Sequence, residues 1–130
     1  MKYIYPAVFT AEEKGFSINF PDIESCYTCG DDLLDGHDMA EDVLALTLYD
    51  YEVEGRDIPA PTEIRDLDLG ANEFVTFIAC DTIKYRKLKS SKAVKKTLTI
   101  PQWLNEMAAA KGLNFSQILQ EALTERLNII

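Results

Sequence analysis

The sequence predicts an α+β protein built from two parts, a β-β-β-α-β unit followed by a smaller β-α-α unit. Residues near the start of the chain alternate apolar and polar side chains, which is typical of half-buried strands. Apolar residues recur at helical spacing after Asp32 and again after Pro101. The charge also changes sign, because residues 1–82 hold 4 Lys/Arg and 19 Asp/Glu whereas residues 83–130 hold 9 and 3. We therefore expect one domain at residues 1–82, a linker at 83–92 and a second domain at 93–130.

The composition indicates a folded protein of ordinary size. The chain has 130 residues, of which 47% are hydrophobic, and no apolar run approaches the roughly 18 residues of a membrane span. Its N-terminus alternates in polarity and lacks the apolar centre of a signal peptide. Three cysteines in a chain without an export signal favour reduced thiols over a disulfide framework. We expect a cytoplasmic, unprocessed protein that does not contact a membrane.

A hairpin and a third strand are predicted at the N-terminus. Residues 2–10 and 16–20 alternate in polarity and are rich in β-branched and aromatic residues, and the intervening "EEKG" is typical of a turn. Pro21 and Asp22 interrupt this pattern. The segment "SCYTC" (25–29) that follows is expected to form the third strand.

One helix and one further strand complete the first unit. Asp32 is a favourable N-cap, and Asp35 lies three positions later, where the acid of a capping box is found. Apolar residues then follow helical spacing as far as Tyr51, and the opposite face is acidic. After an acidic, irregular connection at residues 55–73, the segment "EFVTFIAC" predicts a fourth strand at residues 74–80.

The last part of the chain has clear helix boundaries. The segment "AVKKTLTI" (93–100) predicts a strand, Pro101 is expected at the first helical position, and Gly112 lies just beyond the expected helix end. Asn114 is the expected N-cap of a second helix, with Gln117 in the third position of a capping box.

A single strand with two short helices cannot enclose a core, so this unit is expected to dimerise. Two antiparallel copies of the strand would form a ribbon that fits the major groove of DNA. Because side chains alternate along a strand, Leu98 and Ile100 should face the helices. Lys95, Thr97 and Thr99 should then face outward, as candidate residues for reading base edges.

Phosphate contacts and dimer contacts are predicted around that ribbon. The start of the second helix, at Asn114, Phe115 and Ser116, offers backbone N–H groups and the positive end of the helix dipole to a phosphate. Lys96 adds a positive charge for the same purpose. The expected dimer contacts are the apolar residues Leu98, Ile100, Trp103, Ile118, Leu119 and Ala122.

Two segments of the sequence resemble known families. "VKKTLTIPQWLNEMAAAKGLNFSQILQEAL" is similar to ribbon-helix-helix domains of the MetJ/Arc type. "YPAVF", "GFSINFPDI" and "CYTCGDD", in this order, resemble the HicB antitoxin family. The resemblance implies a type II antitoxin rather than an enzyme. Family members bind and inhibit a small basic HicA ribonuclease, which cleaves mRNA, through a truncated RNase H-like N-terminal domain, and they repress their own operon with the C-terminal domain.

The resemblance implies three partners: a HicA-type toxin, operator DNA and a second copy of the chain. It leaves open whether two dimers join into a tetramer. Candidate toxin contacts are Asp22, Glu24 and Tyr27, beside or within the third strand. The chain departs from the family pattern at Glu24-Ser25, where Pro-Gly is common, and at Gly36, where a helix former would be expected.

Two other functions stay open from the residues alone. Asp22, Glu24, Asp31 and Asp32 could hold Mg²⁺ in a metal-dependent nuclease, although Asp31 and Asp32 suit a turn and an N-cap better. A ligand-responsive ribbon-helix-helix repressor is the stronger alternative, but the sequence contains no cofactor motif.

Cys26 and Cys29 form a C-x-x-C motif, which is the spacing of many redox and zinc sites. Side chains three positions apart on a strand point to opposite faces, so they cannot easily share a disulfide or a metal. The remaining candidates, Cys80 and His37, make no second ligand pair. We expect no cofactor, no metal and no catalytic residue, with Cys26 buried and Cys29 exposed.

Overall fold

A computed structural model describes residues 1–129. The chain divides into two compact units, and the boundary between them in the sequence falls between Ser91 and Lys92. We call them the N-terminal unit and the C-terminal unit and describe each by itself. Within the described residues, no helix is both long enough and apolar enough to cross a lipid bilayer.

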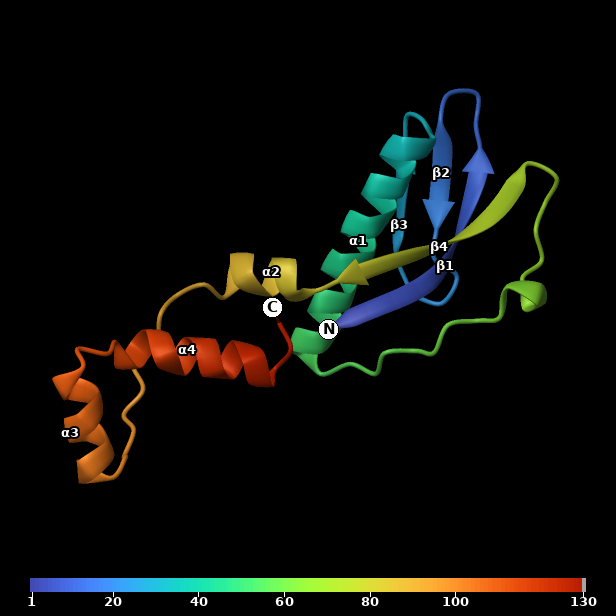
Figure 1. Ribbon diagram of the computed structural model, residues 1–130. Coiled ribbons are helices and arrows are strands. Elements are labelled where there is room, and N and C mark those ends of the chain that lie inside the picture. The colour runs from blue at the N-terminus through green and yellow to red at the C-terminus, as the bar shows by residue number, and fades with distance from the viewer. Residues whose placement is uncertain (130) are drawn as a thin grey trace. The chain divides into compact units, whose positions relative to one another are not determined.

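The N-terminal unit contains one antiparallel sheet of four strands in the order β3-β2-β1-β4 (Figure 1). The predicted succession β-β-β-α-β is confirmed, and an additional helix follows it. The third strand begins two residues later than expected, and the fourth is one residue longer at each end. The strands are β1 (Lys2–Ala11), β2 (Phe16–Asn19), β3 (Tyr27–Gly30) and β4 (Glu73–Asp81).

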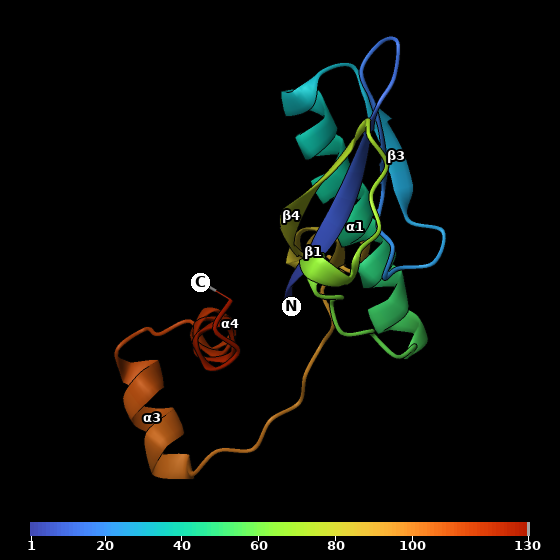
Figure 2. The same cartoon turned by 90° about the vertical axis from the view of Figure 1, so that its right-hand side faces the viewer.

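Helix α1 (Leu33–Glu54) covers one face of this sheet (Figures 1 and 2). The Asp32 carboxylate caps it, as predicted, by accepting a hydrogen bond of 2.8 Å from the Asp35 N–H. Gly55, with a φ of 68°, ends it in the left-handed conformation. The largest fully buried side chains of the core come from both layers: Phe9, Ile18, Phe20, Leu44, Leu48 and Ile78.

Gly36 occupies a helical position that would ordinarily favour another residue, and close packing explains its presence. A Cβ atom on Gly36 would lie 3.2 Å from side-chain atoms of both Phe9 and Ile18. A Cβ atom on Gly30, at the end of β3, would lie 2.3 Å from the Gly36 Cα. The two glycines therefore let α1 approach β3 backbone to backbone, at a distance that no side chain permits.

We expect Gly30→Ala to lower the free energy of unfolding of the N-terminal unit by about 3 kcal/mol or more, since the new methyl group meets backbone that must move. Urea unfolding followed by circular dichroism measures this. Gly55→Ala is the matched control: its Cβ meets nothing within 4 Å, so only the left-handed φ of 68° costs energy, about 1 kcal/mol. Equal losses in the two variants would contradict the close-packing explanation.

The chain still turns at its other departure from the family pattern, Glu24-Ser25. Ser25 adopts a φ of 57°, in the left-handed region that glycine occupies most readily. The chain thus makes a left-handed turn with a serine, directly before the buried Cys26.

Residues 83–92 do not form the simple linker that was predicted. Helix α2 (Ile83–Lys89) occupies most of this range and belongs to the N-terminal unit. Tyr85 packs against the hydrophobic core, and its hydroxyl donates to the Asp42 carboxylate of α1 at 2.8 Å. The Lys84 ammonium lies 3.4 Å from the same carboxylate. The sequence did not indicate this helix because low apolar content and a run of cations are typical of a solvated connection.

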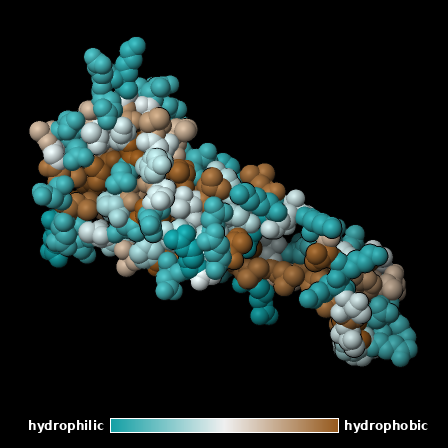
Figure 3. All heavy atoms as spheres, turned by 180° about the vertical axis from the view of Figure 1, so that it is seen from behind, coloured by the Kyte–Doolittle hydropathy of each residue, from teal (hydrophilic) through white to brown (hydrophobic). Residues whose placement is uncertain are grey.

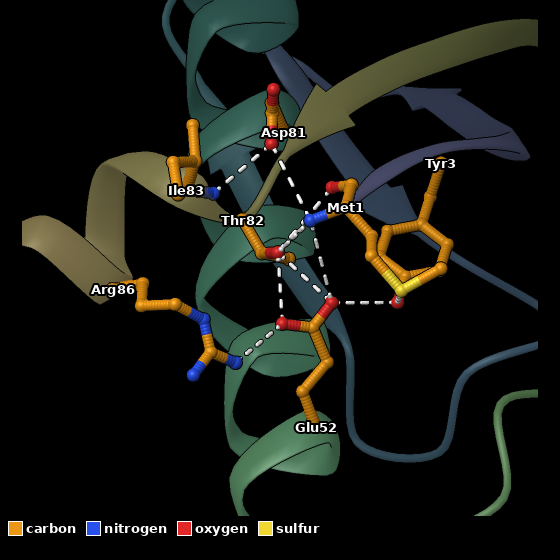
Figure 4. A network of polar contacts seen from close by, with 7 residues as sticks. All are labelled: Met1, Tyr3, Glu52, Asp81, Thr82, Ile83 and Arg86. Carbon is orange, nitrogen blue, oxygen red and sulfur yellow. Dashed lines mark hydrogen bonds and ion pairs between the residues drawn. The ribbon is translucent and has the colours of Figure 1, made fainter. Parts of the chain in front are cut away.

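The end of β4 is fixed to α1 by a network around Glu52 (Figure 4). The Glu52 carboxylate accepts hydrogen bonds from the Tyr3 hydroxyl at 2.6 Å, the Thr82 hydroxyl at 2.9 Å and the Arg86 guanidinium at 2.9 Å. The α-ammonium group of Met1 lies 3.7 Å from it and donates to the Thr82 hydroxyl at 2.9 Å. One carboxylate thus joins α1 to β1, α2 and the segment between β4 and α2.

Burial opposes the ionisation of Glu52, but the hydrogen bonds from Tyr3, Arg86 and Thr82 and the charge of the terminal amine outweigh it, and the pKa of Glu52 is lowered. A lowered pKa in the folded state gives stability that is complete above the unfolded value of about 4.3 and is lost as the pH falls below it. We therefore expect Glu52→Gln to lower the free energy of unfolding by about 1–3 kcal/mol at neutral pH.

The difference between wild type and Glu52→Gln should shrink as the pH falls below about 4, because Glu52 of the unfolded chain is then protonated, and it should be smallest once the pH is below the lowered pKa of folded Glu52. Urea unfolding at several pH values measures it. Glu54→Gln is the control on the same helix, because Glu54 is 57% exposed and its carboxylate lies 3.7 Å from the Arg56 guanidinium; a change within about 0.5 kcal/mol is expected there. A difference for Glu52→Gln that does not vary with pH would rule out the ionic origin.

Candidate nucleic-acid and protein interfaces

The segment at residues 92–101 precedes the first helix of the C-terminal unit. No strand forms at residues 93–100, where one was predicted, and every side chain there is exposed. The physical reason is that strand hydrogen bonds need a second strand, and the described residues of this unit include none. The predicted base-reading residues Lys95, Thr97 and Thr99 are exposed, as is Lys96, but so are the intervening apolar residues.

Two helices follow, α3 (Gln102–Ala110) and α4 (Phe115–Arg126). Pro101 is the residue before the first helical one, so the predicted boundary is displaced by one residue. Gly112, with a φ of 65°, lies beyond the end of α3, as expected. The Asn114 side chain caps α4, as expected, by accepting a hydrogen bond of 3.0 Å from the Gln117 N–H.

The predicted dimer contacts lie mostly at the surface of the single chain. Trp103 is 62% exposed, Leu98 57%, Ile118 43% and Ile100 42%. Ala122 is exposed and Leu119 is half-buried. None of the described residues of the C-terminal unit is buried. This unit therefore has no hydrophobic core of its own, although it forms two helices, of which α4 has a side-chain cap.

The start of α4 remains a prediction for a phosphate site. Asn114, Phe115 and Ser116 are all exposed, and the positive end of the α4 dipole lies there. Phe115, at 46% exposure, places an apolar ring beside this helix end.

The three candidate toxin contacts in the N-terminal unit differ in their surroundings. The Asp22 carboxylate accepts hydrogen bonds from the Thr62 N–H at 3.1 Å and from the Thr62 hydroxyl, so it has a structural task. Glu24 is exposed, and Tyr27 is 70% exposed on the face of the sheet opposite α1. Glu24 and Tyr27 are therefore accessible to a partner, whereas the Asp22 carboxylate holds the segment around Thr62 in place.

Two of the four acids that could suggest a nuclease have structural tasks. The Asp22 carboxylate accepts hydrogen bonds from Thr62, and the Asp32 carboxylate caps α1. Over residues 1–129, no group of three or more His, Cys, Asp or Glu side chains is arranged to hold a metal ion.

The C-x-x-C motif separates into one buried and one exposed thiol, as predicted: Cys26 is buried and Cys29 is exposed. Burial raises the pKa of Cys26 above its usual value, even though a hydrogen bond with Thr47 acts in the opposite direction. Burial and the nearby carboxylates of Glu41 and Asp81 raise the pKa of Cys80 to about 12. Both buried thiols are thus protonated at neutral pH, which makes them poor nucleophiles.

A family model described as "HicB_like antitoxin of bacterial toxin-antitoxin system" matches residues 5–123. The chain belongs to the HicB-like antitoxin family. This is a family of antitoxins and not of enzymes. The curated protein Antitoxin HicB 2 from Photorhabdus laumondii is 36% identical over 58 residues, which are 45% of this chain and 42% of that relative. The match therefore spans less than half the length of that relative.

Solved structures of HicB antitoxins resemble the chain over most of its length. A toxin-antitoxin complex from Streptococcus pneumoniae contains a chain with a TM-score of 0.63 and 28% identity, and the alignment covers 97% of this chain and 99% of that one. The crystal structure of antitoxin HicB3 has a TM-score of 0.53 and 31% identity, with 95% and 97% covered. A chain of the HicA3 and HicB3 toxin-antitoxin complex has a TM-score of 0.51 and 28% identity, with 61% and 99% covered.

One feature of this HicB-like chain was not predicted from its sequence. The segment at residues 56–72, which includes the short helix η1 (Ile64–Asp66), begins at the end of α1 and passes to the side of the sheet opposite α1 (Figures 1 and 2). We call this segment the arch. Between it and Phe77 of β4 is an open groove of about 740 Å³. The only signal in the sequence was the apolar residue Phe77 at an outward position of a strand.

Proposed function

We propose that this HicB-like protein is a cytoplasmic antitoxin with two binding activities. Its N-terminal unit, a truncated RNase H-like fold, binds and neutralises a small, basic, mRNA-cleaving ribonuclease of the HicA type. Its C-terminal unit, a ribbon-helix-helix fold, dimerises and binds operator DNA through a paired β-ribbon in the major groove, and so represses the antitoxin's own operon.

The observation that carries the dimer is the exposed apolar surface of the C-terminal unit. Leu98, Trp103, Met107, Leu123 and Leu127 are each between 51% and 66% exposed, and hydrophobic residues are visible among the hydrophilic ones on this unit in Figure 3. Each side chain of this size stabilises an assembly by about 1.5–3 kcal/mol when it becomes fully buried. A second copy of the same unit supplies a matching surface and the missing partner strand.

The DNA-binding part of the proposal requires residues 93–100 of two copies to pair as strands. Antiparallel pairing would satisfy backbone groups that are exposed in the single chain, and alternation would turn Leu98 and Ile100 inward. Lys95, Thr97 and Thr99 of both copies would then lie on one outer surface. Lys can donate to guanine, and Thr offers a hydroxyl to a base edge and a methyl to thymine.

The distribution of charge supports toxin binding by the N-terminal unit and DNA binding by the C-terminal unit. The net positive charge of the C-terminal unit is smaller than that of residues 83–130. Residues 1–91 hold 8 Lys/Arg and 19 Asp/Glu, a net charge of −11, whereas residues 92–130 hold 5 and 3, a net charge of +2. Four of the nine Lys/Arg in residues 83–130 lie on α2 in the N-terminal unit. The DNA-binding charge is therefore concentrated on Lys92, Lys95 and Lys96, and a dimer doubles it.

The toxin-binding part rests on relatives and on charge. One similar structure is of a HicA3 and HicB3 toxin-antitoxin complex, and the similar chain from Streptococcus pneumoniae also comes from a toxin-antitoxin complex. A net charge of −11 on the N-terminal unit suits a basic partner.

The test uses the full-length chain with a HicA-type toxin from the same operon and a DNA fragment from the upstream region. We expect the antitoxin to suppress RNA cleavage by the toxin in a stoichiometric titration, to sediment as a dimer and to bind the DNA with an affinity that falls steeply with salt. Undiminished RNA cleavage in the presence of excess antitoxin would refute the neutralising role, and a monomer that binds DNA would refute the paired ribbon.

A further inference from the structure

The face of the sheet opposite α1 carries a strip of apolar residues on its two longest strands. β1 and β4 pair so that Pro6 lies opposite Phe77 and Ile4 opposite Ala79, and directly paired residues point to the same face. Ile4 is 50% exposed and Phe77 48% exposed. Next along the same face, Val8 pairs with Val75, and both are half-buried. A soluble sheet with one covered face would ordinarily present polar residues here.

The arch turns part of this strip into a concave site. Hydrogen bonds between Thr62 and Asp22 hold the first half of the arch in place. At the far end of the arch, the Asn72 side chain donates to the Ala11 carbonyl at 3.2 Å. Between these points the groove is lined by Phe77 and by the arch residues 61–65. An aromatic ring at the base of a groove, with half of its surface exposed, is typical of the pockets that anchor a partner's side chain.

We propose that this groove, together with Ile4 and Phe77, is the surface on which the basic toxin docks. The inference rests on the proposed function and specifies where the N-terminal unit carries it out. An apolar side chain of the toxin inserts against Phe77, and cationic side chains around it meet the acids of the arch. Apolar centres with a polar rim are the usual anatomy of protein interfaces.

Charge decides between a basic partner and a second copy of this chain. The arch holds four acids, Asp57, Glu63, Asp66 and Asp68, and two arginines. Glu63 and Arg65 line the groove itself, and the other acids lie elsewhere along the arch. Arg56 is already engaged, since its guanidinium lies 3.9 Å from the centre of the Tyr51 ring. Pairing two N-terminal units here would bring together two bodies with a net charge of −11 each, whereas a basic toxin is attracted.

The convex surface of α1 is the competing location. It exposes Leu34 (74%) and Met39 (42%) beside acids such as Asp38. These apolar side chains stand on a helix rather than in a groove, so a partner that contacts them desolvates them less completely than it desolvates Phe77.

The decisive measurement is calorimetric titration of the HicA-type toxin from the same operon into the full-length antitoxin. We expect Phe77→Ser to weaken binding by at least about 30-fold and Ile4→Ser by about 5-fold or more. Leu34→Ser, an exposed apolar residue of α1, is the matched control and should change affinity less than about 3-fold. Circular dichroism and operator binding check that each variant is folded.

The outcomes separate the docking surface from the proposed function. A wild-type chain that does not bind the toxin refutes the proposed function itself. Wild-type binding with no loss in Phe77→Ser and Ile4→Ser, or with an equal loss in Leu34→Ser, refutes only the location of the surface. If Phe77→Ser fails to fold, Ile4→Ser decides alone.

Discussion

Replacing Leu98 and Ile100 together by Asp should convert the protein into a monomer that no longer binds its operator. In the proposed dimer both side chains face the helices, so the double variant places four carboxylates in an apolar interior. An unpaired buried charge costs several kcal/mol, in addition to the lost burial of two aliphatic side chains at about 1.5–3 kcal/mol each. We expect the dimer dissociation constant to rise at least about 1000-fold, which is about 4 kcal/mol.

Sedimentation equilibrium over a range of concentrations measures this change. The matched control is the double variant Thr97→Asp with Thr99→Asp, which adds the same charge to the same segment at positions proposed to face outward. The control should remain dimeric and lose DNA binding only, and both variants should still inhibit the toxin. If both double variants dissociate alike, the assignment of inner and outer faces is wrong.

Lys95→Ala and Thr97→Ala should each weaken operator binding while leaving the inhibition of the toxin unchanged. A base contact contributes about 1–3 kcal/mol of discrimination, and the proposed dimer uses each residue twice, so a loss of at least about 30-fold is expected. Fluorescence anisotropy with a labelled operator fragment measures the affinity, and a toxin activity assay measures inhibition.

Salt dependence separates the two residues. Lys95→Ala removes a positive charge from each copy and should reduce the slope of log affinity against log salt by about 1–2. Thr97→Ala should leave the slope unchanged. Lys87→Ala is the control, because Lys87 is exposed on α2 of the N-terminal unit. Operator binding that depends on Lys87 as strongly as on Lys95 would place the DNA contact on α2 instead of the proposed ribbon.

Most of the fold of the N-terminal unit could be predicted because its signals are local. Alternation in β1 and β4 and the cap at Asp32 act over a few residues, and the structure confirms them. Helix α2 could not be predicted, since its contacts are made over long sequence distances. Arg86 and Lys89, for example, lie over the ring of Tyr49, at 5.3 Å and 5.6 Å from its centre. Cations that suggested a solvated connection are thus attached to α1.

The candidate sites were less predictable, for two physical reasons. The strand at residues 93–100 has no partner within one chain, so the pairing that would order it is intermolecular. The task of Asp22 depends on Thr62, which is 40 residues away in the sequence. The groove beside Phe77 likewise depends on the path of an irregular segment, which has no periodicity from which its position could be deduced.

The absence of a core in the described C-terminal unit has a consequence for how such an antitoxin responds to its own abundance. Because such a unit acquires its interior only by pairing, the concentration of the paired form rises with the square of the concentration of unpaired chains. When chains are scarce, the unpaired residues 92–101 are exposed backbone, which proteases cut most readily. Scarcity would therefore remove the proposed operator-binding unit first and leave residues 1–91, which have their own core and are the proposed toxin-binding unit. Transcription would resume before protection from the toxin was lost.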